Sequence, residues 1–172
     1  MRVKPSVSCY CIALDPGGTT GVAMVENEEQ PWEITALHLG GSHHQALFRL
    51  LVDRRPSVVV CETFENRGQS SSTQARAASL VSREYIGIVK LYLQATGATG
   101  EWQSSSTGKQ FWDDEKLKEY GLYCPGLKHA RDAIRHYAYW RVFTFGDKSI
   151  LRGTTGHIKT SPSRSQDSFT AT

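Results

Sequence analysis

Three acidic side chains of this 172-residue chain stand at positions that a solvated surface does not explain. Asp15 ends the apolar run CIALD, and Glu62 ends SVVVCE, a run of β-branched and other apolar residues. Asp132 lies in KHARDAIRHY, among residues that we expect to face a sheet. His129 precedes Asp132 by three positions, which leaves the two side chains about 60° apart on one face of a helix.

These residue types suit a site for divalent metal ions. Carboxylates that converge repel one another, and their charged forms are disfavoured unless a cation lies among them. Oxygen ligands suit Mg²⁺ or Mn²⁺, and an imidazole moves the balance somewhat toward Mn²⁺. Two such ions about 3.5–4 Å apart can activate a water molecule and stabilise the leaving oxygen of a phosphodiester.

Each of these residues also has a simpler interpretation. Asp15 alone is compatible with a turn or capping aspartate, and Glu62 with a strand-end residue paired with Arg67 or another cation. His129 and Asp132 alone are compatible with a hydrogen-bonded helix face. The spacing of these residues does not decide between the interpretations, because it does not show that the three sites meet in space.

Hydrophobic patterns predict five strands and four helices that would carry these residues. Ser42 is expected to cap the first helix and Gly121 to end the third. The order of elements, β-β-β-α-β-α-β-α-α, predicts a mixed sheet with helices packed on its faces. The strands are expected at 9–15, 20–26, 32–39, 57–64 and 98–102, and the helices at 42–56, 74–95, 107–123 and 128–145.

Composition predicts one folded domain at 1–146, followed by a Ser/Thr-rich, disordered tail at 147–172. The net charge of +3 is compatible with a polyanionic partner, but it is too small to indicate one. No apolar run approaches the length of a membrane span, and the first residues lack a long apolar segment. We therefore expect a cytoplasmic protein that makes no membrane contact.

The three acidic blocks resemble one known family. IALDPGGTTGVAMV resembles the first hairpin of RuvC-like Holliday-junction resolvases, which belong to the ribonuclease H-like nuclease superfamily. VVVCETF resembles the strand of that family that ends in its second catalytic Glu. HARDAIRH resembles its C-terminal helix, in which an acidic or His residue precedes an Asp by three positions. The similarity covers residues 9–145 in element order and has the character of the shorter, phage-type resolvases.

The resemblance implies a ribonuclease H-like α/β fold, whose mixed five-stranded sheet has three antiparallel strands and then parallel ones, flanked by helices. It also implies a metal-dependent endonuclease that resolves four-way DNA junctions by paired phosphodiester hydrolysis in recombination, repair or replication. Asp15, Glu62 and Asp132 would bind two Mg²⁺ ions, or Mn²⁺, with His129 as a fourth ligand or an acid/base aid. The enzyme would be a homodimer, with helix 74–95 in the dimer or junction contact, and would work in the host-cell cytoplasm if phage-encoded.

Two features of the sequence depart from the family or extend it. Position 129 is His where many relatives have Asp, which lowers the negative charge of the site. The loop after Glu62 does not match closely, so Phe64 is only a candidate for a side chain that wedges between bases. Basic residues would bind phosphates near the metal site, and the candidates are Arg67, Arg76 and Lys109.

The glycines of the first hairpin also fit this interpretation. Gly17, Gly18 and Gly21 are expected to let the hairpin turn close to Asp15 while leaving room for metal and a DNA strand. Two other functions remain open from the sequence. One is a ribonuclease H-like nuclease that acts on flaps, forks or RNA–DNA hybrids, and the other is a nuclease-dead protein that binds branched DNA.

Overall fold

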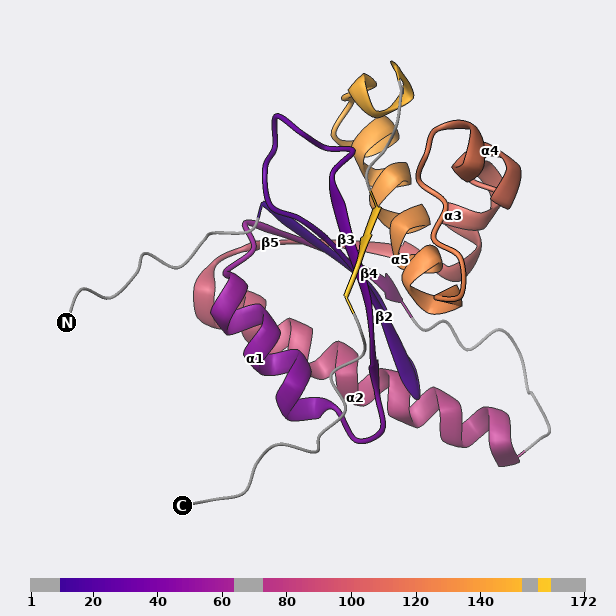
Figure 1. Cartoon of the computed structure of the whole chain (residues 1–172). Coiled ribbons are helices and arrows are strands. Elements are labelled where there is room, and N and C mark those ends of the chain that lie inside the picture. The colour runs from indigo at the N-terminus through magenta and orange to yellow at the C-terminus, as the bar shows by residue number, and fades with distance from the viewer. Residues whose placement is uncertain (1–9, 64–72, 153–157, 162–172) are drawn as a thin grey trace.

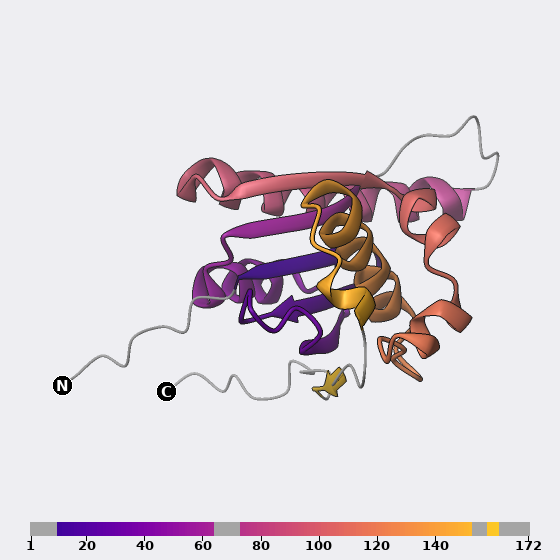
Figure 2. The same ribbon diagram turned by 90° about the horizontal axis from the view of Figure 1, so that it is seen from above.

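A six-stranded sheet forms the centre of the molecule (Figure 1). The computed structural model describes residues 10–63, 73–152 and 158–161. The strands lie in the order β5-β4-β1-β2-β3-β6, so that β5 and β6 form the two edges (Figure 2). Their bounds are β1 (Cys11–Asp15), β2 (Thr19–Val25), β3 (Ile34–Gly40), β4 (Val58–Thr63), β5 (Thr99–Ser104) and β6 (Ile158–Thr160).

The strand directions agree with the predicted mixed sheet. β1, β2 and β3 pair antiparallel, whereas β4 pairs parallel with β1 and β5 pairs parallel with β4. The prediction of five strands is therefore confirmed in order and direction. β6 is an additional strand, and it pairs parallel with β3.

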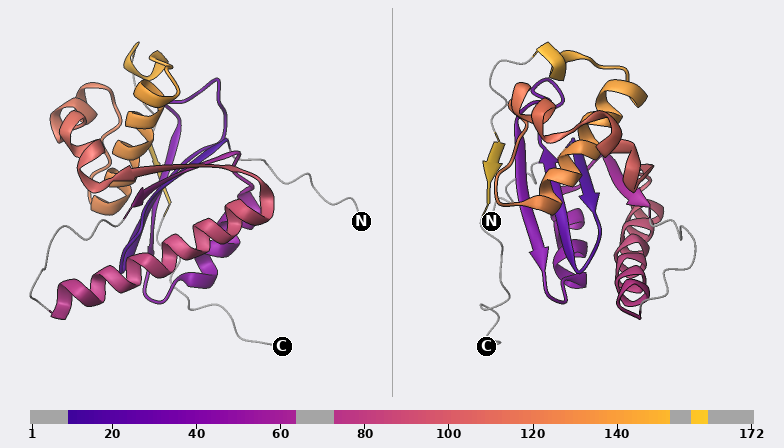
Figure 3. Two further views of the ribbon diagram at one scale, coloured as in Figure 1. Left: turned by 180° about the vertical axis from the view of Figure 1, so that it is seen from behind. Right: turned by 90° about the vertical axis from the view of Figure 1, so that its right-hand side faces the viewer.

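Helices cover both faces of this sheet (Figures 1 and 3). α1 (His44–Arg54) and α2 (Thr73–Thr96) pack against one face, and α5 (Lys128–Tyr139) packs against the other. α3 (Ser105–Phe111) packs on α5, and α4 (Asp114–Glu119) follows α3. Among the described residues, no helix has both the length and the apolar composition that a membrane span requires.

The alternation of side chains along β1 places its acidic residue. Ile12 and Leu14 pack in the core beneath α1 and α2, whereas Cys11 and Ala13 pack beneath α5. Because successive side chains point to opposite faces of a strand, Asp15 continues the series that faces α5.

Three predicted helix features differ from the structure. The helix predicted at 107–123 is two helices, because Asp113 begins a second one by accepting a hydrogen bond from the Lys116 amide at 2.8 Å. Residue 43, not Ser42, is the N-cap of α1, and it makes no side-chain capping bond. The helix predicted at 128–145 changes at Trp140 into a π-helical turn that ends at Thr144.

The tail predicted to be disordered contributes two described elements, so that prediction is wrong for them. Ser149–Arg152 forms a 3₁₀-helix in which Ile150 is only 1% exposed, and Ile158 pairs with Ile34 as β6 joins the sheet. The reason is that isoleucines spaced along this polar segment bury apolar surface against the domain. The domain boundary at residue 146 stays a prediction.

Gly21 permits the close approach of α5 to the sheet. A Cβ atom at Gly21 would lie 1.9 Å from the carbonyl oxygen of His129, whereas a Cβ at Gly18 would meet no atom within 4 Å. Of the glycines expected to leave room for metal and DNA, Gly21 therefore makes room for α5 itself. The position of the α5 N-terminus depends on this contact.

We expect Gly21→Ala to destabilise the protein by at least about 2 kcal/mol, because the added methyl group overlaps backbone and α5 must move. Gly18→Ala is the matched control and should change the free energy of unfolding by no more than about 0.5 kcal/mol. Urea unfolding of both variants measures the difference. Equal stabilities would contradict the assigned role of Gly21.

Candidate active site

The parallel pairing of β1 and β4 brings two of the acidic residues together. Leu14 pairs with Cys61, so the next residue of each strand, Asp15 and Glu62, lies at the same carboxyl edge of the sheet. Val60 packs in the core beneath α5, and Glu62 shares its face of the strand. Both carboxylates therefore face α5.

The N-terminus of α5 brings His129 to this edge. Nδ1 of His129 lies 2.9 Å from Oδ2 of Asp15. Leu127, the N-cap of α5, makes no side-chain capping bond. His38 from β3 supplies one in its place, because the Ala130 amide donates a hydrogen bond to His38 Nε2 at 3.1 Å. β2 and β3 thus fix the helix end, through Gly21 and His38.

The electrostatics of Asp15 show that the acidic residues converge. Its pKa is raised from an ordinary value of 3.8 to about 6, mainly by burial and then by the negative charge of Glu62. The charge of Asp132 raises this pKa further, whereas the hydrogen bond and charge of His129 lower it. Asp15, Glu62 and Asp132 therefore interact electrostatically, as the metal-site hypothesis requires.

Asp132 is almost completely buried and has two basic partners. One carboxylate oxygen pairs with the Arg135 guanidinium, and the other lies 3.2 Å from Nζ of Lys109. Arg135 also pairs with Asp114 and donates a hydrogen bond from Nε to the Trp112 carbonyl at 2.7 Å. Arg135 thereby connects the α3–α4 junction to Asp132.

Glu62 pairs with a histidine that the sequence interpretation did not single out. Nε2 of His136 lies 2.9 Å from Oε2 of Glu62, and Nδ1 of the same ring lies 2.9 Å from Oε1 of Gln103. His136 is four residues after Asp132 and seven after His129, so a helical repeat places all three on neighbouring turns of one face. That spacing is the signal that would have found it.

The side chains at this edge are suitable ligands for divalent metal ions. In this structure, however, each of the three carboxylates is paired with a basic side chain. In the described part of the chain, no group of three or more His, Cys, Asp or Glu side chains is arranged to hold a metal ion. The repulsion that raises the pKa of Asp15 is the interaction that a divalent cation would relieve. Carboxylate oxygens and one imidazole are suitable ligands for Mg²⁺ or Mn²⁺.

Not all of the proposed site residues can be compared with the structure. Asp15, Glu62, His129 and Asp132 meet at the carboxyl edge, and Lys109 reaches Asp132 from α3. The remaining candidates are Arg67 and Phe64, which lie outside the described residues, and Arg76, which lies in α2 but whose side chain is outside them. Their roles stay predictions.

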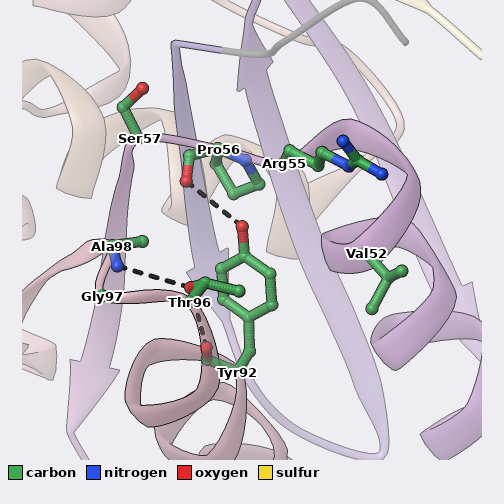
Figure 4. Close-up of a pocket in the computed structure, with 8 residues that line it drawn as sticks. All are labelled: Val52, Arg55, Pro56, Ser57, Tyr92, Thr96, Gly97 and Ala98. Atoms are coloured by element: carbon green, nitrogen blue, oxygen red, sulfur yellow. Dashed lines mark hydrogen bonds between the residues drawn. The ribbon is translucent and has the colours of Figure 1, made fainter.

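A cavity of about 490 Å³ lies away from this site. Pro56 and Ser57 line it just before β4, and Gly97 and Ala98 line it just before β5, so it opens at the amino edge of the sheet. Figure 4 shows the Tyr92 side chain among the residues that line the cavity, with its hydroxyl donating to the Pro56 carbonyl. No carboxylate or thiol lines this cavity, which makes it unsuited to the chemistry considered above.

The overall arrangement is similar to that of solved resolvases. A structure of Thermus thermophilus RuvC in complex with a Holliday junction substrate has 18% sequence identity and a TM-score of 0.56, covering 78% of this chain and 94% of that one. The yeast mitochondrial Holliday junction resolvase Ydc2 has 10% identity and a TM-score of 0.40, covering 84% and 85%. No protein-family model and no curated protein sequence matches this chain. The likeness to the Thermus structure and the strand order establish that this chain has the ribonuclease H-like fold.

Proposed function

We propose that this protein is a metal-dependent endodeoxyribonuclease that resolves four-way DNA junctions in recombination, repair or replication. One observation carries the proposal: Asp15 is buried at the carboxyl edge of a ribonuclease H-like sheet, and burial, then the charge of Glu62 and that of Asp132, raise its pKa. Such mutual repulsion at the end of rigid strands is costly for the fold alone, and it is typical of sites that function with cations.

Asp15, Glu62 and Asp132 would hold the metal ions, with His129 as a fourth ligand. Two Mg²⁺ ions held there would supply a water nucleophile and would stabilise the leaving oxygen of the phosphodiester. The chain itself positions the groups: β1 and β4 are rigid, and α5 is fixed by Gly21 and its neighbours. Strands and helices hold metal-binding side chains more accurately than loops do.

Lys109 is suited to contact the scissile phosphate. Its side chain is half exposed, and its ammonium group lies 3.2 Å from Asp132. A metal ion held by Asp132 would compete with Lys109 for this carboxylate and would leave the lysine available to a phosphate. Arg135 is buried and pairs with both Asp132 and Asp114.

A homodimer would place two such sites on one junction, each cutting one of two opposed strands. Leu80 and Leu91 on α2 support this, because they are 59% and 57% exposed and lie eleven residues apart, on one stripe of the helix. A phage-type resolvase in the host-cell cytoplasm is part of the same proposal.

Asp15→Asn should lower cleavage of a synthetic four-way junction in Mg²⁺ or Mn²⁺ by at least about a hundredfold, because metal binding supplies several kcal/mol of transition-state stabilisation. The matched control is Asp53→Asn, at an exposed position of α1, which should cut normally. Symmetric nicks by the wild-type protein would support the proposal. Equal cutting of flaps and junctions would favour a broader nuclease, and tight junction binding without cutting would favour a DNA-binding protein.

Asp15→Asn should also stabilise the metal-free protein at neutral pH. The folded state binds a proton at Asp15 more tightly than the unfolded state, so stability that is present below pH 3.8 is lost as the pH rises through about 6. Asn does not ionise, and the stability of the variant relative to wild type should rise by about 1–3 kcal/mol between pH 4 and 7.5. Urea unfolding in EDTA measures this difference, and a pH-independent difference would contradict the account.

Lys109→Gln should weaken junction binding and reduce its salt dependence. Losing one phosphate contact lowers the slope of log K against log salt concentration by about one. The comparison is made in an Asp15→Asn background, which leaves the DNA uncut. Lys118→Gln is the control, because Lys118 lies over the Tyr123 ring, 4.9 Å from its centroid, and should leave the slope unchanged. Identical slopes for both variants would remove Lys109 from the interface.

A further inference from the structure

His136 is a buried polar residue that the proposed mechanism does not use. It is only 1% exposed, and it lies one helical turn beyond Asp132 on α5. A buried imidazole is stable only if its polar atoms have hydrogen-bond partners. Both ring nitrogens of His136 have one, Gln103 at Nδ1 and Glu62 at Nε2, each at 2.9 Å.

Gln103 determines which nitrogen of His136 carries hydrogen. Its side-chain amide nitrogen donates to the backbone carbonyl of His136 at 3.1 Å, and a carbonyl oxygen can only accept. The amide orientation is therefore fixed, with Oε1 toward Nδ1 of His136. Because Oε1 also only accepts, Nδ1 must carry a hydrogen.

The contact with Glu62 then depends on the other ring nitrogen. Oε2 of Glu62 lies 2.9 Å from Nε2 of His136, a distance that requires one hydrogen between them. The contact therefore ties Oε2 of Glu62 to a ring whose other nitrogen is already bonded to Gln103.

We infer that His136 is a positioning residue: oriented by Gln103, it forms a hydrogen bond with Glu62 and holds this carboxylate in the geometry that binds metal. The role rests on the proposed function, because it is defined by the part of Glu62 in the metal site. Glu62 and Gln103 are paired neighbours on β4 and β5, and His136 bridges them from α5.

This arrangement restricts the rotation of a carboxylate side chain at the end of a strand. Glu62 has three rotatable bonds, and Asp15 repels it. A hydrogen bond at Oε2 removes most of that freedom before any metal binds, as hydrogen-bond partners behind metal ligands commonly do. The same three residues tie β4, β5 and α5 together beneath the site.

The experiment compares His136→Leu, His136→Gln and Gln103→Leu in the full-length protein. Titration calorimetry with Mn²⁺ in the absence of DNA measures metal affinity, and thermal unfolding reports folding. We expect His136→Leu to weaken Mn²⁺ binding by about ten- to a hundredfold. His136→Gln retains an N–H donor at the position of Nε2 and should recover most of the affinity. Gln103→Leu should lie between them, because the ring remains but is no longer oriented.

Tyr137→Phe is the matched control for loss of a buried hydrogen bond of α5. The Tyr137 hydroxyl donates to the Pro31 carbonyl at 3.0 Å, away from Glu62. This variant should lower the melting temperature without changing Mn²⁺ affinity. If His136→Leu also changed only the melting temperature, or if His136→Gln were as defective as His136→Leu, the positioning role would be wrong. Should His136→Leu fail to fold, Gln103→Leu decides, and unchanged Mn²⁺ affinity in that variant would overturn the role.

Failure of this role and failure of the proposed function give different results. If wild-type protein binds Mn²⁺ and His136→Leu weakens that binding, but the wild type cuts no DNA, the nuclease proposal fails and the positioning role stands. If wild-type protein cuts junctions and the variants bind Mn²⁺ and cut as well as wild type, only the positioning role fails.

Discussion

Mutual repulsion among three carboxylates at one edge of the sheet is the constraint around which this protein is organised. Asp15 shows it directly, since burial, Glu62 and Asp132 all raise its pKa. An ionised carboxylate in a buried position is tolerated only with compensating charge or hydrogen bonds. The chain supplies basic partners for all three acids: His129 for Asp15, His136 for Glu62, and Arg135 with Lys109 for Asp132.

Most of these compensating groups lie on α5, so the closeness of that helix to the sheet is the second requirement. Gly21 lets the backbone of β2 approach the backbone of α5. The small side chains of Ala13, Ala23 and Ala133 let the helix and the sheet pack closely. His38, on β3, accepts a hydrogen bond from the Ala130 amide in the first turn of α5. Arg135 extends the arrangement to α3, which packs on α5 and contributes Lys109, and to α4, which contributes Asp114. Fold and site are therefore specified by the same contacts.

Much of this could be predicted from the sequence, for a physical reason. Asp15 and Glu62 follow apolar runs, and the carboxyl ends of parallel strands meet, so both positions are readable from local pattern. The pair His129 and Asp132 is readable from helical spacing. His136 shares this spacing, but its role depends on Gln103, a residue of a distant strand whose contact no local pattern reveals.

Other features depend on tertiary contacts in the same way. The break between α3 and α4 does have a local signal, since Asp113 is a good N-cap residue. β6 has none, because three residues of a polar segment form a strand only where β3 offers an unpaired edge. Gly21 resembles a turn glycine in sequence, and only the position of α5 shows that it is a crossing point.

The central claim is that the repelling carboxylates form a site for divalent metal ions. The most direct measurement is an anomalous difference map from crystals of the protein soaked in Mn²⁺. The account predicts a peak within about 2–2.5 Å of carboxylate oxygens of both Asp15 and Glu62. A well-ordered site with no peak there, and with His129 still paired to Asp15 and Lys109 to Asp132 in excess Mn²⁺, would contradict it.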